Sequence, residues 1–454
     1  MTVVIQGCAV ATVDADGTEY ADGHVVVDGD RIVAVGAGPA GPATLDAADE
    51  VVDGRGCLAT PGLVNTHHHL YQWATRGLAQ DDDLFGWLTT LYPVWEGLDE
   101  DVVGAATAAG LGWLARTGCT STSDHHYVFP RDGGDVLGAT VAAAREVGLR
   151  FHPTRGSMDL GQSAGGLPPD SVVETTDAAL AGTLRALDEL HDPSPGSMLR
   201  MGVAPCSPFS VTEELMREAA ALGRDRGVRL HTHLAETVDE DTFCRSRYDC
   251  TPAEYADRLG WLGDDVWFAH CVHVDESAAK RFAATGTGVA HCPTSNARLG
   301  AGLAPVVTLL GAGVPVGLGV DGSASNEESS LVTELHAAVM VARLRGGATA
   351  MTARDALRLG TIGGAQVLGR SDEIGSLEPG KLADLALWRV DGLGHAGCED
   401  PVAALVLGSR PPLTRLMVGG RTVVADDVLV TTDEASLARR AATATRRLLE
   451  RSGR

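Results

Sequence analysis

The middle of the chain, residues 59–370, alternates short apolar segments with helical stretches, and this alternation constrains the fold more than any other feature. Segments such as Leu230–Leu234 and Val316–Val320 have the length and apolar character of buried strands. The stretches Gly104–Arg116 and Glu213–Arg226 have the composition of helices. Such alternation is typical of parallel βα units, which usually close into a barrel. We therefore predict an α/β protein in which residues 59–370 form a (β/α)8 barrel of the TIM type.

Both ends of the chain are rich in strand-like segments and differ from the middle. These segments are Val3–Val10, His24–Val27, Arg31–Val35 and Leu385–Trp388. We predict that residues 1–58 and 371–454 together form one small domain of the β-sandwich type. Its last segment, Glu434–Glu450, is rich in Ala, Leu and Arg and predicts a surface helix.

The composition limits the partners and the compartment. With 454 residues, 44% of them hydrophobic, the chain can bury a large core. No run of about 18 apolar residues marks a membrane span, and no signal segment opens the chain, so we expect a cytoplasmic protein. A net charge of −24 would repel a nucleic-acid backbone, so we expect neither nucleic acid nor membrane as a partner. Nine dispersed cysteines without a CxxC pair indicate reduced thiols rather than disulfides or a cysteine zinc site.

The first polar cluster closes an apolar strand and reads Pro61-Gly62-Leu63-Val64-Asn65-Thr66-His67-His68-His69. Residues two apart on a strand project to the same face, so His67 and His69 can bind one cation together while His68 points away. The active sites of barrels lie at this end of their strands. We therefore favour a metal site over three polar loop histidines.

A second strand, in Leu230-His231-Thr232-His233-Leu234-Ala235-Glu236, ends on a histidine with a glutamate three residues further on. His233 is a candidate third metal ligand, and Glu236 could reach the reacting centre as a general acid or base. The alternative for Glu236 is an ordinary glutamate in a first helical turn. His231 lies one pleat deeper, where we expect it to pack or to support a ligand.

Two further strands end on polar residues. In Ala269-His270-Cys271-Val272-His273 either histidine could face the pocket; we favour His270 to polarise the attacking water or a substrate oxygen, and expect His273 to be structural. The strand Val316–Val320 ends on Asp321, a carboxylate that can ligate an ion and accept a proton from water. A capping aspartate is the alternative. Four such strand ends in one βα chain predict a metal site at the carboxyl end of the barrel.

With these residues placed, the sequence resembles the amidohydrolase superfamily, in which HxH follows the first strand and His, His and Asp follow later ones. The offset of Glu236 in HTHLAE resembles the cytosine/guanine deaminase-like group. The likeness spans nearly the whole chain, including the split β domain with its GSLEPGKLADL segment. Within the group, NTHHHLYQ, the aromatic stretch Phe85–Trp95, TSTSDHHYVFP, RGSMDLG with GGLPPD, HCPTSNARLG and GVDGSASN look like 8-oxoguanine deaminases. The s-triazine hydrolases have similar motifs.

The resemblance also bears on the metal content. Two-metal members of the superfamily generally use a bridging carboxylated lysine from a middle strand. The chain has only two lysines, Lys280 and Lys381, and both follow the His233 strand. The resemblance therefore implies one divalent ion, Zn²⁺ with Fe²⁺ as the alternative. The implied metal ligands are His67, His69, His233 and Asp321. Cys206 is the other candidate for a bridge, although a buried thiol is the better interpretation.

The activity implied by the resemblance is hydrolytic deamination of a purine-like heterocycle, with 8-oxoguanine converted to urate and ammonia. Its catalytic residues would be Glu236, His270 and Asp321. Candidate substrate contacts are Gln72 and Arg155, with Asp124 and His125 at a third strand end; bracing of loops is the alternative for all four.

Other interpretations stay open. Trp87, Tyr92 and Trp95 have near-helical spacing and predict either a lid or the core side of a helix. The second candidate function is an s-triazine or pterin amino- or chlorohydrolase that uses the same site. A non-catalytic scaffold is the third, although a scaffold should have lost ligands that are all present here. We expect a small-molecule heterocycle as the partner and a homo-oligomer as the default assembly.

Overall fold

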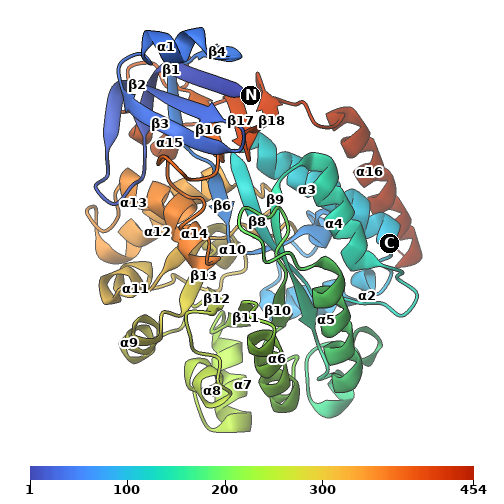
Figure 1. Cartoon of the computed structure of the whole chain (residues 1–454). Coiled ribbons are helices and arrows are strands. Elements are labelled where there is room, and N and C mark those ends of the chain that lie inside the picture. The colour runs from blue at the N-terminus through green and yellow to red at the C-terminus, as the bar shows by residue number, and fades with distance from the viewer. Residues whose placement is uncertain (454) are drawn as a thin grey trace.

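The computed structural model describes residues 1–453, which form a barrel joined to a mixed β-sheet (Figure 1). Eight parallel strands close the barrel in the order β10-β11-β12-β13-β14-β6-β8-β9. They are β6 (Leu63–Asn65), β8 (Cys119–His126), β9 (Arg150–Ser157), β10 (Gly202–Pro205), β11 (Leu230–Leu234), β12 (Val266–His270), β13 (Gly288–His291) and β14 (Val316–Leu318). The predicted (β/α)8 barrel is confirmed.

Helices surround the barrel, and several begin at a side chain that caps their first turn. Asp99 accepts from the Val102 N–H at the start of α3, and Thr212 accepts from the Leu215 N–H at the start of α6. The helices of this part of the chain are α2 (Leu84–Trp95), α3 (Glu100–Arg116), α4 (Val136–Val147), α5 (Thr176–Leu190), α6 (Glu213–Asp225), α7 (Val238–Tyr248), α8 (Pro252–Arg258), α9 (Glu276–Thr285), α10 (Pro293–Arg298), α11 (Val306–Ala312), α12 (Leu331–Gly346), α13 (Ala353–Arg358) and α14 (Gly364–Val367).

The two chain ends form one nine-stranded mixed sheet, ordered β19-β18-β17-β16-β5-β1-β2-β3 with β4 beside β1. The strands are β1 (Thr2–Ala11), β2 (Glu19–Asp28), β3 (Arg31–Ala37), β4 (Glu50–Asp53), β5 (Cys57–Pro61), β16 (Leu385–Arg389), β17 (Leu413–Val418), β18 (Arg421–Ala425) and β19 (Val428–Leu429). The short helices α1 (Pro42–Asp46) and α15 (Pro401–Leu407) accompany them. The edge strand β3 returns to the segment before β16, where the Ile32 N–H donates to the Lys381 carbonyl over 2.9 Å. The sheet therefore curls around its own apolar core, as a β domain built from both termini requires.

The sheet is attached to the barrel by close backbone packing and a buried ion pair. Gly118, between α3 and β8, has φ +87°, and a Cβ there would lie 2.0 Å from the Trp388 ring, so no side chain fits. On the other side, the Arg150 guanidinium donates to both carboxylate oxygens of Asp384 over 2.9 Å, and both side chains are 1% exposed. These contacts fix β16 and the residue before it against the amino ends of β8 and β9.

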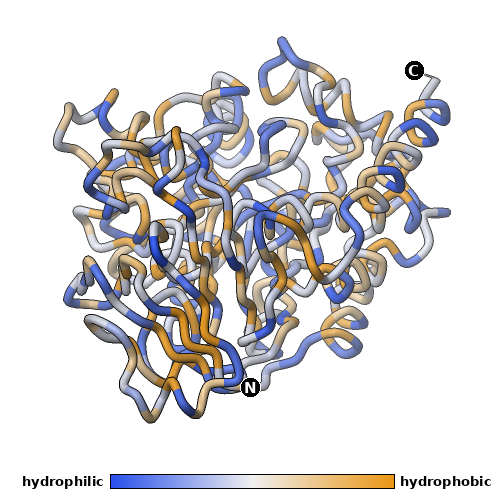
Figure 2. The backbone as a smooth tube through the Cα atoms, turned by 90° about the horizontal axis from the view of Figure 1, so that it is seen from above, coloured by the Kyte–Doolittle hydropathy of each residue, from blue (hydrophilic) through white to orange (hydrophobic). Residues whose placement is uncertain are grey.

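The last helix, α16 (Glu434–Arg451), packs on α3 of the barrel (Figure 1). It agrees with the helix predicted over Glu434–Glu450. Leu437, Ala441, Ala444 and Leu448 are its buried residues, and its hydrophobic and hydrophilic residues alternate in Figure 2. The strands near the N-terminus carry longer hydrophobic stretches in the same view. Across residues 1–453, no helix combines the length and the apolar character that crossing a bilayer demands.

Candidate metal and active site

The candidate site lies at the carboxyl ends of the barrel strands. His67 follows β6, His233 lies in β11, and His270 ends β12. His69 belongs to a short strand, β7 (His68–His69), which pairs with β15 (Asp321–Gly322) after β14. This two-stranded ladder places Asp321 beside the HxH segment, so the structure brings all five predicted residues together.

The backbone at these strand ends adopts a left-handed conformation that L-residues rarely take. The φ angles are +52° at Ala235, +72° at His270 and +60° at Asp321. Positive φ at several non-glycine residues in one place is typical of functional sites, where the surrounding structure holds a strained conformation. Here the positive φ angles turn His270 and Asp321 toward the barrel axis, and the one at Ala235 changes the direction of the chain just before Glu236.

Four donor atoms converge at the centre of the site. His69 Nε2 lies 3.0 Å from His233 Nε2, while Asp321 Oδ1 lies 3.2 Å from His67 Nε2 and 3.3 Å from His69 Nε2. The possible ligands fall into two overlapping groups whose donor atoms lie within 4.8 Å of one another. These groups are His67, His69, His125 and His233, and His67, His233, His270 and Asp321.

Hydrogen bonds at the far side of each imidazole fix which nitrogen carries the proton. His69 Nδ1 donates to the His125 carbonyl over 2.6 Å, and His233 Nδ1 donates to the Cys206 carbonyl over 2.7 Å. His67 Nδ1 lies 2.8 Å from His231 Nε2. Because His231 Nδ1 must donate to the Trp267 carbonyl at 2.9 Å, His231 Nε2 accepts from His67. All three candidate ligand rings therefore direct an unprotonated Nε2 toward the centre.

This donor set fits a divalent cation. His67 Nε2 is buried and has no hydrogen-bond partner, and the Nε2 lone pairs of His69 and His233 face each other at 3.0 Å. Lone pairs this close repel unless a cation lies between them. Three neutral imidazoles and one carboxylate, each held from behind by a hydrogen bond, are the ligands that Zn²⁺ and related ions take in catalytic sites.

The protonation of the cluster agrees with metal binding. Burial lowers the pKa of His233 to about 3 and that of His67 well below its ordinary value, so both rings are neutral at pH 7. Burial acts to raise the pKa of Asp321, but the surrounding imidazoles of His67, His270 and His69 outweigh it and hold this pKa well below its ordinary value. Ser295 Oγ and Ser325 Oγ donate to Asp321 Oδ2 over 2.5 and 3.1 Å and fix the carboxylate.

Glu236 and His270 form the other half of the site. Glu236 is 4% exposed, and its Oε2 lies 3.7 Å from His270 Nε2. Burial raises the pKa of Glu236 to about 7. His270 Nδ1 is hydrogen-bonded to Asn296 Oδ1 over 2.9 Å, which directs its Nε2 toward Glu236 and Asp321. Below them Glu240 accepts from the main-chain N–H groups of Ala235 and Glu236 over 2.8 and 3.0 Å and so holds the strained turn.

Gln72 is the predicted substrate contact that does line the cavity. It lies in the 3₁₀ helix η1 (Leu70–Thr75), is 1% exposed, and has neither its amide nitrogen nor its amide oxygen hydrogen-bonded. Gly322 makes room for it, since a Cβ there would lie 1.7 Å from Gln72 Oε1. A buried amide with both ends free is equipped to hydrogen-bond a planar heterocycle that carries donors and acceptors on one edge.

Arg155, the other predicted substrate contact, does not reach the cavity. Its position on β9 directs the side chain outward, where it donates to Glu174 over 2.7 Å and lies against Phe129 and Gly182 of α5. It therefore braces the outside of the barrel, because neighbouring residues of a strand face opposite sides. His273 also lies away from the cavity and bonds the Ala301 carbonyl over 2.8 Å. His68 points away from the ligands, and its Nδ1 accepts from the His69 N–H.

The cavity over the site is nearly closed. Its free volume is about 30 Å³, and its lining includes Leu84, Trp87, Leu88 and Tyr92 of α2 together with Phe209. Trp87 Nε1 donates to the Ala324 carbonyl over 3.1 Å, and the Phe85 and Phe209 rings lie 5.0 Å apart. Trp95 is fully buried and belongs to the core. The helix thus combines both predicted roles, covering the site with one part and packing in the core with another.

Groups that could have made a metal bridge lie elsewhere or are unsuited to it. Lys280 is exposed on α9, and Lys381 donates to Ser371 and Ser376 in the mixed-sheet part. The Cys206 thiol lines the cavity 3.9 Å from His233 Nδ1, but burial raises its pKa to about 12, which keeps it protonated. Neither lysine can provide the usual carboxylated bridge.

The structure adds residues whose roles the linear sequence does not reveal. His125 donates through Nε2 to the Ala204 carbonyl and stacks on His233 with ring centres 4.8 Å apart, so its Nδ1 is a further donor atom beside the cluster. Asp124 holds η1 by accepting from the Leu70 N–H over 2.8 Å. The motif TSTSDHHYVFP pointed to His125 and Asp124 as polar strand-end residues. Nothing local marked Glu240 or Ser295, which act through contacts made only in the fold.

The barrel and its cluster of histidines and aspartate define a metal-dependent hydrolase, and the comparisons with known proteins agree. The profile of the amidohydrolase family matches residues 58–423. The chain is 44% identical over 434 residues to the 8-oxoguanine deaminase of Pseudomonas aeruginosa, covering 94% of this chain and 95% of that protein. It is 38% identical over 446 residues to the isoxanthopterin deaminase of an unknown prokaryotic organism, covering 93% and 91%.

Solved structures lead to the same family. The atrazine chlorohydrolase of Arthrobacter aurescens TC1, complexed with zinc, superposes with a TM-score of 0.92 at 33% identity, covering 98% of this chain and 100% of that chain. The chain therefore belongs to the amidohydrolase family.

Proposed function

We propose that this enzyme hydrolytically deaminates an amino-substituted, purine-like heterocycle, with 8-oxoguanine to urate and ammonia as the leading reaction. The observation that carries the proposal is Glu236, a buried carboxyl group placed 3.7 Å from His270 at the edge of the metal-ligand cluster. Expulsion of an amine requires a proton donor beside the reacting carbon, and a carboxyl group in this position can be that donor. Similarity to the deaminases of 8-oxoguanine and isoxanthopterin, both fused bicyclic rings, supports this substrate class.

We assign the metal site to one divalent ion, Zn²⁺ in the first place and Fe²⁺ as the alternative. His67, His69, His233 and Asp321 would hold it, and neither Lys280 nor Lys381 is placed to bridge a second ion. When bound, such an ion lowers the pKa of water toward about 7 and so supplies a nucleophile at neutral pH.

The protein side chains perform the remaining steps. Asp321 takes a proton from the attacking water as the new C–O bond forms at the amino-bearing ring carbon. Glu236 protonates the adjacent ring nitrogen, which places the electron pair of the opened C=N bond on a neutral N–H. His270, held by Asn296, stabilises the incoming oxygen. The proton on Asp321 then passes to the amino group, the C–N bond breaks, and ammonia leaves. The added oxygen becomes the ring carbonyl, and its remaining proton returns to Glu236.

Gln72 orients the ring, because both ends of its amide are free inside the cavity. The cavity volume of about 30 Å³ is close to the space that one water molecule occupies, so a bicyclic ring enters only when α2 moves away from the Phe209 segment. Closure of the helix then excludes bulk water from the reacting atoms.

The test is ammonia release from 8-oxoguanine, guanine, isocytosine, isoxanthopterin and a hydroxylated s-triazine by zinc-analysed protein. We expect a clear preference for 8-oxoguanine, and a rate about 10²–10⁴-fold lower for Glu236→Gln with metal content retained. Glu213→Gln on the exposed start of α6 is the matched control and should leave the rate unchanged.

The outcomes separate the candidate functions. Ammonia from a pterin or triazine alone would retain the chemistry and replace the substrate. Full activity of Glu236→Gln would refute the proton-donor assignment. If a metal-loaded protein released no ammonia from any of the five compounds, deamination would be refuted. A protein that binds no metal would favour the non-catalytic scaffold.

A further inference from the structure

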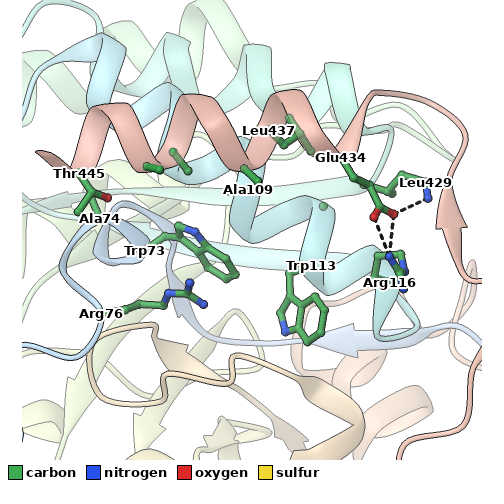
Figure 3. A pocket seen from close by; sticks show the side chains of 14 residues that line it. Trp73, Ala74, Arg76, Ala109, Trp113, Arg116, Leu429, Glu434, Leu437 and Thr445 are labelled. Atoms are coloured by element: carbon green, nitrogen blue, oxygen red, sulfur yellow. Dashed lines mark hydrogen bonds and ion pairs between the residues drawn. The ribbon is translucent and has the colours of Figure 1, made fainter. Parts of the chain in front are cut away.

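A second cavity lies on the outside of the barrel, beneath the C-terminal helix (Figure 3). Its volume is about 500 Å³, within the range of small-molecule sites. Its lining comes from η1 and the following Arg76, from α3, from Leu429 of β19 and from α16. The walls are apolar small residues of α16 and α3, such as Ala109 and Ala441, together with two tryptophans, Trp73 and Trp113.

The two indole rings and one cation give this outer pocket its chemical character. Trp73 and Trp113 are both only partly buried although each is large and apolar, and Figure 3 shows both rings at the pocket. The Arg76 guanidinium lies 3.7 Å from the centre of the Trp73 ring. Partly exposed aromatic faces beside a guanidinium favour planar, electron-rich ligands through stacking and cation–π contacts.

Arg76 is the cation that a ligand can engage. Within residues 1–453, Arg76 makes no ion pair; it donates only to the Glu327 main-chain carbonyl over 3.3 Å, while the Glu327 carboxylate pairs with Arg298. Arg116, on the opposite wall, is already occupied by both oxygens of Glu434 at 2.8 Å and by Asp427. Arg76 is exposed and feels the Glu327 carboxylate without forming an ion pair with it, so in a protein of net charge −24 its guanidinium can still attract an anionic ligand.

The outer pocket and the catalytic cavity are lined by neighbouring residues of η1. Trp73 directly follows Gln72, which lines the catalytic cavity from the other side of η1. Trp113 Nε1 donates to the Glu328 carbonyl over 2.6 Å, and Arg76 holds Glu327. Both carbonyls belong to the loop that runs from Asp321 to α12. A ligand in the outer pocket therefore contacts the segment that carries Gln72, and it contacts Arg76 and Trp113, which are hydrogen-bonded to the loop after Asp321.

We propose that the outer pocket binds a planar anionic heterocycle, stacked along Trp113 and Trp73 with its negative edge on Arg76. This identity rests on the proposed function, because urate, the product of that reaction, is such a molecule at neutral pH. The pocket is then a product site separate from the catalytic cavity. Its occupancy changes the positions of η1 and the Asp321 loop, so part of the inhibition by urate is not competitive with substrate.

The test counts urate on the zinc-loaded full-length protein by equilibrium dialysis with labelled urate. We expect two urate molecules per chain, and a loss of at least tenfold in affinity at one of the two sites in Arg76→Gln and in Trp113→Leu. Arg145→Gln, an exposed arginine of α4 without an ion pair in the described chain, is the matched control. Hypoxanthine, a neutral ring of similar size, should bind the outer pocket at least tenfold more weakly than urate in the wild type. This difference should vanish in Arg76→Gln.

Kinetics provide the second readout. The non-competitive component of inhibition by urate should be present in the wild type and in Arg145→Gln, and absent in Arg76→Gln. The proposal would be overturned by one bound urate per chain. It would also be overturned if Arg76→Gln and Trp113→Leu left the urate affinity of both sites unchanged. A smaller assembly of Trp113→Leu than of the wild type, with one urate per chain in both, would also overturn it, since the cavity would then be a contact between copies of the chain. Urate binding that depends on Arg76 in a protein that deaminates no heterocycle would refute the proposed function and leave the outer site standing.

Discussion

The hydrogen bond behind His67 offers a direct test of how the metal site is built. His231→Leu removes the acceptor of the His67 Nδ1–H, which the wild type provides at 2.8 Å in a fully buried position. A buried donor left without a partner costs about 1–3 kcal/mol, which corresponds to roughly 5–150-fold in an equilibrium constant. We therefore expect zinc affinity to fall by about 10–100-fold, which is also the usual effect of losing such a supporting group. Competition against a chelator of known affinity measures it.

Two variants separate the hydrogen bond from packing. The His231 ring also stacks on Trp267, with ring centres 4.4 Å apart, so leucine changes more than one contact. His231→Gln places an amide oxygen near the former Nε2 and should recover most of the lost affinity. His152→Leu, a second buried histidine beside Trp267 that touches none of the ligands, should leave zinc affinity unchanged. An unfolding curve for each variant shows that it is folded. If the wild type, His231→Leu and His152→Leu then bind zinc equally tightly, the supporting role of the His67–His231 hydrogen bond is refuted.

Three further predictions concern the substrate contact, the covering helix and a buried carboxyl group. Gly322→Ala forces Gln72 out of position, since the added Cβ would lie 1.7 Å from its Oε1. We expect a KM for the heterocycle about tenfold higher with zinc content unchanged. An unaltered KM would contradict the contact between Gln72 and the substrate. Trp87→Phe removes the hydrogen bond to the Ala324 carbonyl, so the amides of residues 84–95 should exchange with deuterium about fivefold faster. Unchanged exchange would show that this bond does not hold α2 in place. Burial raises the pKa of Glu334 from 4.5 to about 8, so its contribution to stability is complete below about pH 4.5 and is lost as the pH rises through 8. From pH 4.5 to pH 8 the unfolding free energy of Glu334→Gln should therefore fall by up to about 5 kcal/mol less than that of the wild type. Urea titration at each pH measures it. If the two proteins lose the same unfolding free energy over this range, the loss belongs to other groups.

The barrel and its strand-end histidines were predictable because each strand appears in the sequence as a short apolar segment followed by a polar residue. A buried parallel strand must be short and apolar, and the residue that follows it must face the mouth of the barrel. His233 and His270 therefore stand out as polar residues at the ends of apolar runs. His67 and His69 share a face because side chains alternate along a strand. The same alternation placed His231 one pleat deeper, where the structure shows it supporting His67.

Other features depend on contacts between segments far apart in the chain. Arg155 has the same local appearance as a strand-end ligand, but the register of β9 turns it outward to Glu174, and register is set by neighbouring strands. Glu240 looks like an ordinary helix residue until α7 brings its carboxylate to the turn at Ala235. The outer pocket exists only because α16 packs across α3 and leaves Trp73 and Trp113 partly uncovered.

The nearly closed cavity explains why so many strained and polar groups can persist together. With α2 over the mouth, Glu236 is 4% exposed and Asp321 5% exposed, so their interactions act in a medium with little water to screen them. Each group that faces the reacting centre is also held from behind by the protein: His233 by the Cys206 carbonyl, His270 by Asn296, and Asp321 by Ser295. These bonds exist before substrate arrives, so the protein does not reorganise them during the reaction. We expect the motion that admits a bicyclic ring to separate the helix from the Phe209 segment, where the Phe85 and Phe209 rings lie 5.0 Å apart.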